Sequence, residues 1–137
     1  MPAPKRVMLD TNIYDLIVAR RGFGERLDRA IESGDIEILR TRVQEEEIAR
    51  IPDAVRRAAM RKVRGRLVET SEAAWAGLPK GRTPSADALI AATAAECADV
   101  LVSEDKELRA LVAGGIEVWR FADLVAYVDS LPAPKRR

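Results

Sequence analysis

Short apolar runs alternate along this chain with segments in which apolar residues recur every three or four positions. The runs predict buried strands, and the recurring positions predict amphipathic helices. The predicted strands are residues 5–9, 35–40, 67–69, 100–102 and 116–119. The predicted helices are residues 12–20, 23–33, 42–51, 53–66, 85–97, 105–112 and 122–128, while residues 70–83 give no clear pattern.

Strands that alternate with helices favour a mainly parallel sheet with helices on both faces, which is a three-layer α/β/α sandwich. The length of 137 residues suits one domain, so we expect residues 1–137 to fold as a unit with a frayed tail at residues 132–137. In open parallel sheets, binding sites form in the crevice beyond the carboxyl ends of the strands. We therefore expect the functional side chains at that edge.

The composition is that of a folded protein, with 47% hydrophobic and 33% charged residues. No apolar run approaches the roughly 18 residues that span a bilayer, and no apolar stretch of signal-peptide type follows the N-terminus. We therefore expect a cytoplasmic protein that has no contact with a membrane.

The chain contains no histidine. Its absence excludes histidine general bases, Ser-His-Asp triads and His-ligated zinc. Cys97 is the single cysteine, so an internal disulfide is excluded as well. Hydrolytic chemistry would have to depend on carboxylates, whose oxygens suit hard cations such as magnesium, calcium or manganese.

Two aspartates follow predicted strands. Asp10 ends the strand at residues 5–9, and Asp105 follows the strand at residues 100–102. Each could serve only as a cap or first-turn acid of the next helix, where aspartate is favoured. Capping and metal binding are compatible, because both need a carboxylate at the carboxyl end of a strand. On pattern alone, Glu104 is as good a candidate as Asp105.

Helical phase distinguishes the three consecutive acids Glu45, Glu46 and Glu47. At about 100° per residue, Glu47 falls within the apolar stripe of helix 42–51, and the other two fall outside it. A carboxylate in a buried stripe needs a compensating partner, such as an ion pair or a metal. A glutamate at the rim of the stripe with its head in water is the alternative.

Asp87 lies in the first turn of the Ala-rich helix 85–97. The helix dipole alone would favour an acid there. However, Ile90, Ala91 and Ala94 follow it at helical spacing, so Asp87 begins the most buried stripe of that helix. We expect its side chain to face the sheet.

These four carboxylates can all reach one edge of the predicted sheet. Such a cluster would repel itself, and a divalent cation would relieve that repulsion while activating water and stabilising charge on a phosphoryl group. The pattern therefore indicates a metal-dependent phosphodiesterase site at Asp10, Glu47, Asp87 and Asp105.

At the same places the sequence resembles the PIN-domain nucleases. The segments that carry the resemblance are VMLDTN at residues 7–12, TRVQEEEI at 41–48, SADALIAATA at 85–94 and DVLVSEDKEL at 99–108. The family spacing from Thr41 selects Glu47, the acid that helical phase also selects. In the fourth segment the family aspartate falls on Asp105, and Ser103 takes its usual Ser/Thr place. Residues 53–83 match the family least.

The resemblance implies an α/β/α sandwich, a magnesium or manganese site and hydrolysis of RNA phosphodiester bonds. It implies that the four carboxylates are catalytic and bind the metal, with Asn12 and Ser103 supporting them. Many relatives are toxins of VapBC-type toxin-antitoxin pairs, and many form homodimers. An antitoxin partner and a homodimer are therefore expectations for this chain.

Charge is unevenly distributed although the net charge is only +1. Residues 40–66 hold nine basic and four acidic residues, whereas residues 85–130 hold three basic and nine acidic ones. We predict that the basic helix 53–66 holds RNA phosphates, because arginine grips phosphate with two hydrogen bonds. A solvated helix face is the alternative. The predicted contacts are Arg56, Arg57, Arg61, Lys62 and Arg64.

Two other functions compete with the nuclease. An aspartyl-phosphate protein would use Asp10 as acceptor, but the haloacid-dehalogenase pattern needs a second aspartate where Asn12 stands, and the receiver pattern is also incomplete. A non-catalytic RNA-binding or scaffold module should have lost one or more of the carboxylates.

The helices at residues 12–33 suggest where a partner would bind. Ile13, Leu16, Ile17, Phe23 and Leu27 give more apolar surface than one small core obviously requires. We predict that an antitoxin lies along these helices and that an arginine of the partner reaches the carboxylates. Ordinary core packing or a homodimer contact is the alternative.

Overall fold

The computed structural model describes residues 3–78, 85–112 and 115–132. Within these ranges the chain forms a five-stranded, fully parallel sheet in the order β3-β2-β1-β4-β5. The strands are β1 (Lys5–Leu9), β2 (Ile36–Thr41), β3 (Arg66–Val68), β4 (Val100–Val102) and β5 (Glu117–Trp119). Strand β1 lies in the middle, between β2 and β4, because the chain adds strands first on one side of it and then on the other.

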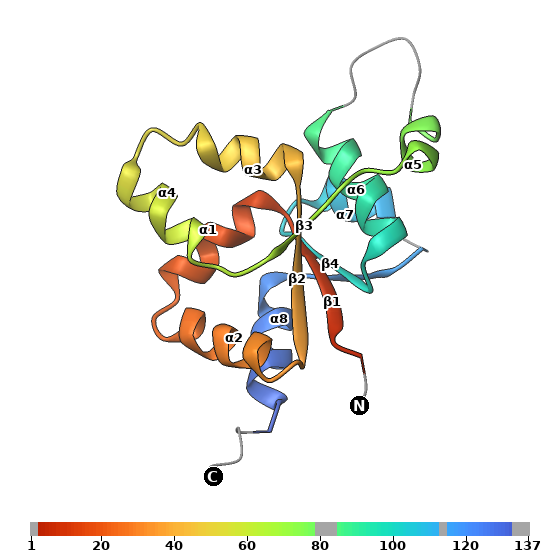
Figure 1. Cartoon of the computed structure of the whole chain (residues 1–137). Coiled ribbons are helices and arrows are strands. Elements are labelled where there is room, and N and C mark those ends of the chain that lie inside the picture. The colour runs from red at the N-terminus through yellow and green to blue at the C-terminus, as the bar shows by residue number, and fades with distance from the viewer. Residues whose placement is uncertain (1–2, 79–84, 113–114, 133–137) are drawn as a thin grey trace.

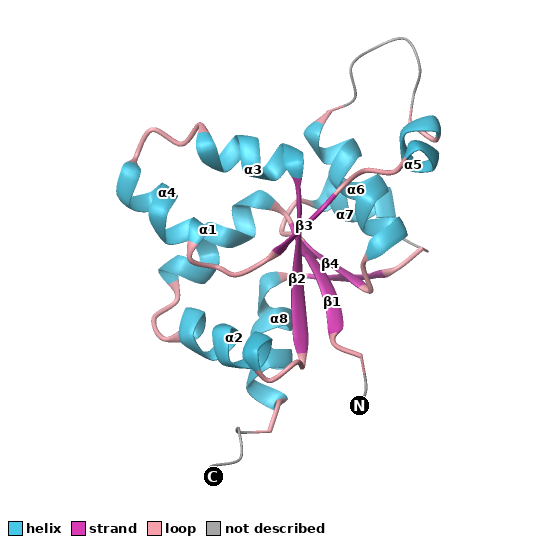
Figure 2. Cartoon of the chain, viewed as in Figure 1, coloured by secondary structure: helices cyan, strands magenta, loops and turns pink. Residues whose placement is uncertain are grey.

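Helices cover both faces of this sheet, as Figures 1 and 2 show. On one side lie α1 (Thr11–Ala19), α2 (Phe23–Glu32), α4 (Ala54–Arg61) and α8 (Phe121–Ser130). On the other lie α5 (Glu72–Ala76), α6 (Ala86–Cys97) and α7 (Lys106–Val112). Helix α3 (Arg42–Ala49) lies over the carboxyl ends of the strands. The predicted three-layer α/β/α sandwich is therefore confirmed.

Successive side chains of a strand point to opposite faces of the sheet, so each layer of helices packs on its own hydrophobic core. Val7 and Leu9 pack into the larger core with α1, α2 and α8, whereas Met8 packs into the smaller one with α6 and α7. All three are fully buried. A strand buried on both faces reads as a continuous apolar run, which is the pattern that predicted β1.

The prediction of one basic helix across residues 53–66 was wrong. Helix α4 ends at Arg61, and a loop through Gly65 leads into strand β3, which pairs with β2. A Cβ atom on Gly65 would lie 3.2 Å from Arg40 Nε and 3.3 Å from the Ile38 carbonyl oxygen. This close approach to β2 favours a glycine there, and pairing with β2 outweighs the helix propensity of the arginines.

The apolar residues of α1 and α2 belong to the core. Ile13, Ile17, Phe23 and Leu27 are at most 1% exposed, and only Leu16 is half-buried. The Phe23 ring packs edge-on against Phe121 of α8, with the ring centroids 5.5 Å apart. The prediction that these five residues form a free binding surface was therefore wrong, and core packing is the reason for their apolar character.

The remaining predicted elements agree with the structure to within one or two residues. Helix α5, over residues without a clear sequence pattern, begins where the Ser71 hydroxyl caps the Ala74 N–H. The predicted tail lies mostly outside the described residues, which end at 132. In the described ranges, no helix combines the length and apolar character that crossing a membrane requires.

Candidate active site

Asp10 is the buried carboxylate of the site. It follows β1 at the N-cap position of α1 and is 6% exposed, yet its side chain makes no capping hydrogen bond. Instead, its Oδ2 accepts a hydrogen bond from the Ser103 hydroxyl at 2.9 Å. Capping therefore does not account for this aspartate, because its side chain faces the loop after β4 rather than its own helix.

Glu47 approaches the same region from α3. Its side chain is half-buried, and its Oε1 accepts a hydrogen bond from the Thr11 hydroxyl at 3.1 Å. Thr11 directly follows Asp10, so this contact ties α3 to the end of β1. Glu46 is exposed, and Glu45 forms an ion pair with Arg40 at 3.0 Å. Helical phase thus selected the glutamate that lies beside Asp10.

Asp87 and Asp105 complete the group from α6 and from the loop after β4. Asp87 is half-buried in the first turn of α6. Asp105 is exposed, and its Oδ1 accepts hydrogen bonds from the N–H groups of Glu107 and Leu108, so it does cap α7. The backbone N–H of Asp105 donates to the Ser103 hydroxyl at 3.0 Å. Ser103 therefore connects Asp10 to Asp105.

The neighbouring carboxylates affect the ionisation of Asp10 and Glu47. Burial raises the pKa of Asp10, and the negative charges of Asp87 and Asp105 raise it further, while the Ser103 hydrogen bond opposes the rise. Burial also raises the pKa of Glu47, with added repulsion from Asp10 and Asp87, against the Thr11 hydrogen bond and the charge of Arg50. Asp10 thus lies within electrostatic range of the other three predicted carboxylates, which come from different elements.

Glu104, which the pattern alone did not separate from Asp105, has another partner. Its carboxylate pairs with Arg120 at 2.9 Å and accepts a hydrogen bond from the Phe121 N–H at 3.0 Å. The hydrogen bond from Arg120 lowers the pKa of Glu104. Glu104 therefore connects the loop after β4 to the start of α8, whereas the negative charge of Asp105 raises the pKa of Asp10.

The side chains that support the carboxylates are only partly those expected. Ser103 is fully buried and bonds to Asp10 as described. Asn12 is exposed, and the hydroxyl beside it, Thr11, contacts Glu47 instead. Gln44, fully buried in the first turn of α3, was missed. The sequence pattern that could have identified Gln44 is its position three residues after Thr41, which is the spacing of a capping box.

The donor set fits a hard divalent cation. Carboxylate oxygens are the ligands that magnesium and manganese prefer. Burial, together with the neighbouring carboxylates, disfavours the ionised forms of Asp10 and Glu47, and a bound cation would offset that cost. As placed, no three acidic side chains among the described residues lie close enough together to hold one ion. Ion binding would therefore have to draw these carboxylates closer together.

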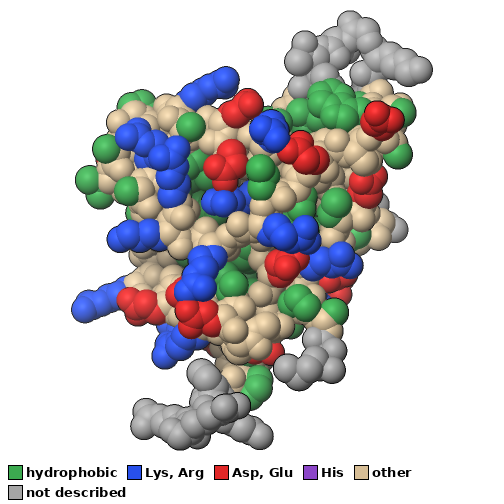
Figure 3. All heavy atoms as spheres, viewed as in Figure 1, with side chains coloured by type: hydrophobic (Ala, Val, Ile, Leu, Met, Phe, Trp, Pro, Cys, Tyr) green, Lys and Arg blue, Asp and Glu red, His purple; other side chains and the backbone are tan. Residues whose placement is uncertain are grey.

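Basic side chains gather over α4 and over the adjoining ends of α1 and α2, on the left in Figure 3. Two of the five predicted RNA contacts are paired within the protein: Arg56 with Asp15 at 2.6 Å, and Arg64 with Asp28 at 2.9 Å. Arg57 donates to the Ile51 carbonyl.

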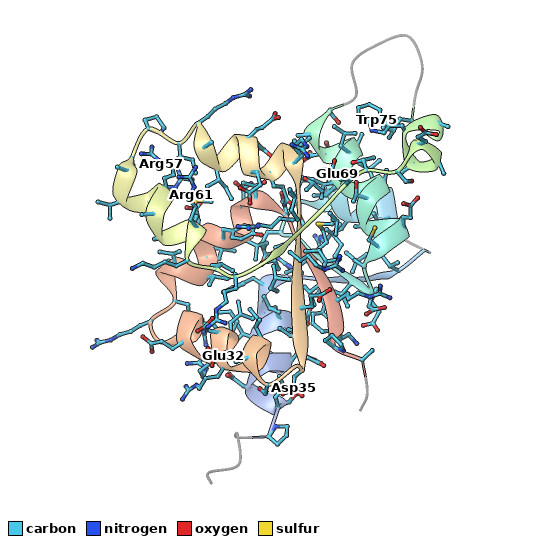
Figure 4. The ribbon with its side chains drawn as sticks, in the orientation of Figure 1. Glu32, Asp35, Arg57, Arg61, Glu69 and Trp75 are labelled. Carbon is cyan, nitrogen blue, oxygen red and sulfur yellow. The ribbon has the colours of Figure 1, made fainter. Side chains whose placement is uncertain are left out.

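Arg57 and Arg61 both lie on α4 in Figure 4. Arg61 and Lys62 are exposed and form no ion pair within residues 3–78, 85–112 and 115–132. Of the five predicted contacts, these two are the side chains best placed to take up a phosphate charge.

Solved structures with the same arrangement of elements come from the PIN-domain proteins. A chain of the VapBC2 complex from Rickettsia felis, bound to a DNA fragment from their promoter, is 16% identical, with a TM-score of 0.57 over 84% of this chain and 98% of that chain. The PIN-domain endonuclease Utp24 is 16% identical, with a TM-score of 0.60 over 85% of each chain. No protein-family model and no curated protein sequence matches this chain. The chain therefore has the PIN-domain fold.

Proposed function

We propose that this protein is a metal-dependent endoribonuclease whose catalytic, metal-binding carboxylates are Asp10, Glu47, Asp87 and Asp105. The observation that carries the proposal is that Asp10 lies within electrostatic range of the other three carboxylates, which come from different elements, and that burial, with added repulsion between the carboxylates, raises the pKa values of Asp10 and Glu47. The PIN-domain fold, with an endonuclease among its structural neighbours, supports it. So does the lack of histidine, which leaves carboxylates as the available acid-base and metal-binding groups.

Different residues of the chain have different roles in the proposed reaction. Magnesium or manganese, when bound, would supply positive charge for the phosphoryl group in the transition state and acidify a water molecule. Ser103 and Thr11 hold one oxygen each of Asp10 and Glu47, so these carboxylates are oriented before substrate arrives. Arg61 and Lys62, at the carboxyl end of α4, would bind phosphates of the RNA strand by charge.

Purified protein should be incubated with structured and unstructured RNAs in magnesium, manganese or excess EDTA. We expect cleavage that needs metal and is lost in Asp10→Asn. Glu46→Gln is the matched control, because Glu46 is an exposed acid of the same helix as Glu47. RNA binding without cleavage in any metal would instead indicate a non-catalytic module, and labelling by a phosphodonor would indicate an aspartyl-phosphate protein.

We further propose that the enzyme is a toxin restrained by a protein antitoxin, as in a VapBC-type pair. A cavity of about 400 Å³ lies between α1, α2 and α4, and none of the four carboxylates lines it. Val18, Ala59 and Val63 contribute accessible apolar surface to it. Its basic lining residues are Arg20, Arg21, Lys62 and Arg64, against the acidic Glu25 and Asp28.

An antitoxin segment that combines apolar and acidic side chains complements this cavity. Val18, 46% exposed on α1, also lines it and would be covered by the segment. Expression without neighbouring genes should arrest growth, and the arrest should require Asp10. Harmless accumulation of an active nuclease would contradict the toxin role.

The expected homodimer and the cytoplasmic location stay predictions, for which sedimentation and cell fractionation are the tests.

A further inference from the structure

The Gln44 side chain lies where strands β1 and β2 stop pairing. Strands β1 and β2 pair in register from Lys5 with Ile36 as far as Met8 with Leu39. Beyond that point, the Gln44 carboxamide stands between the two chains. Its Oε1 accepts a hydrogen bond from the Thr41 N–H at 2.9 Å, and its Nε2 donates to the Leu9 carbonyl oxygen.

The orientation of this carboxamide is fixed by its partners. An N–H group needs an acceptor and a carbonyl needs a donor, so exchanging the oxygen and nitrogen of Gln44 would set like groups against each other. The backbone N–H of Gln44 also donates to the Thr41 hydroxyl at 3.2 Å, which completes the capping box of α3. The side chain is fully buried, so water cannot replace these bonds without opening the structure.

The two groups that Gln44 joins lie next to two of the proposed ligands. The Leu9 carbonyl immediately precedes Asp10, and Glu47 lies three residues after Gln44 on the same side of α3. Without the carboxamide, the Leu9 carbonyl and the Thr41 N–H would be free to bond directly to each other. That bond would draw the start of α3 toward β1 and displace Glu47 relative to Asp10.

We propose that Gln44 is a positioning residue, which sets the separation of the Asp10 and Glu47 carboxylates by bridging β1 to α3. It is the counterpart of Ser103, which bridges Asp10 to the loop after β4 on the other side of β1. This role rests on the proposed metal-dependent nuclease, and it concerns a residue that touches neither metal nor RNA.

Gln44→Met tests the proposal, because methionine keeps the length of the side chain and removes both hydrogen bonds. Loss of a group that orients metal ligands typically weakens metal affinity or activity by about 10- to 100-fold. We expect the Kd for Mn²⁺, measured by calorimetry on the intact protein, to rise at least tenfold. We also expect kcat for RNA cleavage to fall by a similar factor at an unchanged KM for RNA.

Ile36→Ala is the matched control. Ile36 is 1% exposed and begins β2, the strand whose last residue, Thr41, bonds to Gln44; it lies at the edge of the sheet opposite the carboxylates. This variant should lose thermal stability while keeping the Mn²⁺ affinity and kcat of the wild type. If Gln44→Met does not fold, Gln44→Asn takes its place, since its shorter amide cannot reach both partners.

The outcomes separate the two proposals. A wild-type protein that binds Mn²⁺ and cleaves RNA, together with a Gln44 variant unchanged in both, would overturn the positioning role alone. Equal losses of Mn²⁺ affinity and kcat in Gln44→Met and Ile36→Ala would also overturn it. Reduced stability would then account for the losses in both variants. A wild-type protein that neither binds Mn²⁺ nor cleaves RNA would overturn the proposed function and the positioning role with it.

Discussion

The bond between Ser103 and Asp10 gives a prediction whose magnitude follows from the structure. The Ser103 side chain is fully buried, donates to a buried carboxylate at 2.9 Å and accepts from the Asp105 N–H at 3.0 Å. Ser103→Ala removes both bonds with little change in volume. Asp105 itself is exposed, so water can replace the bond to its N–H, and most of the loss comes from Asp10.

At pH 7, without metal, the hydrogen bond joins a hydroxyl to an ionised acid. Such bonds contribute about 1.5–3 kcal/mol, so Ser103→Ala should lower the free energy of unfolding by about 2 kcal/mol. With an unfolding entropy of about 2.1 cal/mol/K per residue over the 137 residues, this corresponds to a fall in Tm of about 7 °C.

The cost should depend on pH in a definite direction. The Ser103 bond lowers the pKa of Asp10, which burial has raised, so the variant has a still higher Asp10 pKa. The ionised form of Asp10 therefore costs more in the variant, and this excess cost is present only above the folded pKa. As pH falls through that pKa, Asp10 is protonated and the difference between variant and wild type should shrink to about 1 kcal/mol, the value of a neutral hydrogen bond.

Urea unfolding in EDTA at several pH values between 7 and about 4 measures this difference. Thr93→Val is the matched control, because the partners of the buried Thr93 hydroxyl among the described residues are neutral: the Leu89 carbonyl at 2.7 Å and the Thr70 hydroxyl at 2.9 Å. Its cost should not vary with pH. A cost of Ser103→Ala that is equally constant would refute the reasoning, since the bond would then not depend on the charge of Asp10.

Three further predictions concern activity and substrate. Asp10→Asn should lose RNA cleavage while its Tm in EDTA stays equal or rises, because a raised pKa means that the ionised side chain destabilises the fold; a clear fall in Tm would contradict this. Glu47→Gln should be inactive and Glu46→Gln nearly silent in the same cleavage assay, and the reverse result would place the wrong glutamate at the site. Neutralising Arg61 and Lys62 together should reduce the slope of log affinity for RNA against log salt by about two. An unchanged slope would assign this face to solvent or to the partner.

The sequence predicted the sheet and the carboxylates because both depend on local patterns. Buried parallel strands read as apolar runs, and an acid that ends such a run lies at the carboxyl edge whatever the helices do. Asp10 and Asp105 follow from this rule, and Glu47 follows from helical phase. Pattern alone did not separate Glu104 from Asp105, because the partner of Glu104 is Arg120, a residue sixteen positions away.

The errors came from contacts between distant residues. Residues 53–66 read as one helix, but Gly65 approaches Arg40 of β2 and the chain then joins the sheet. Phe23 was taken for surface because its partner Phe121 lies almost a hundred residues later. Gln44 went unnoticed because its main partner is the backbone of Leu9, which carries no side-chain signature.

The middle position of β1 has a consequence for synthesis of the protein on the ribosome. Residues 5–9 are made first, yet they need β4, at residues 100–102, to complete their pairing. Ribosomes add about 5–20 residues per second, so Asp10 waits several seconds before the loop carrying Ser103 and Asp105 exists. A nascent chain therefore lacks part of the carboxylate group until translation has passed residue 105. In the proposed ribonuclease, this order of assembly delays cleavage of RNA, including the message being read, until translation has passed residue 105.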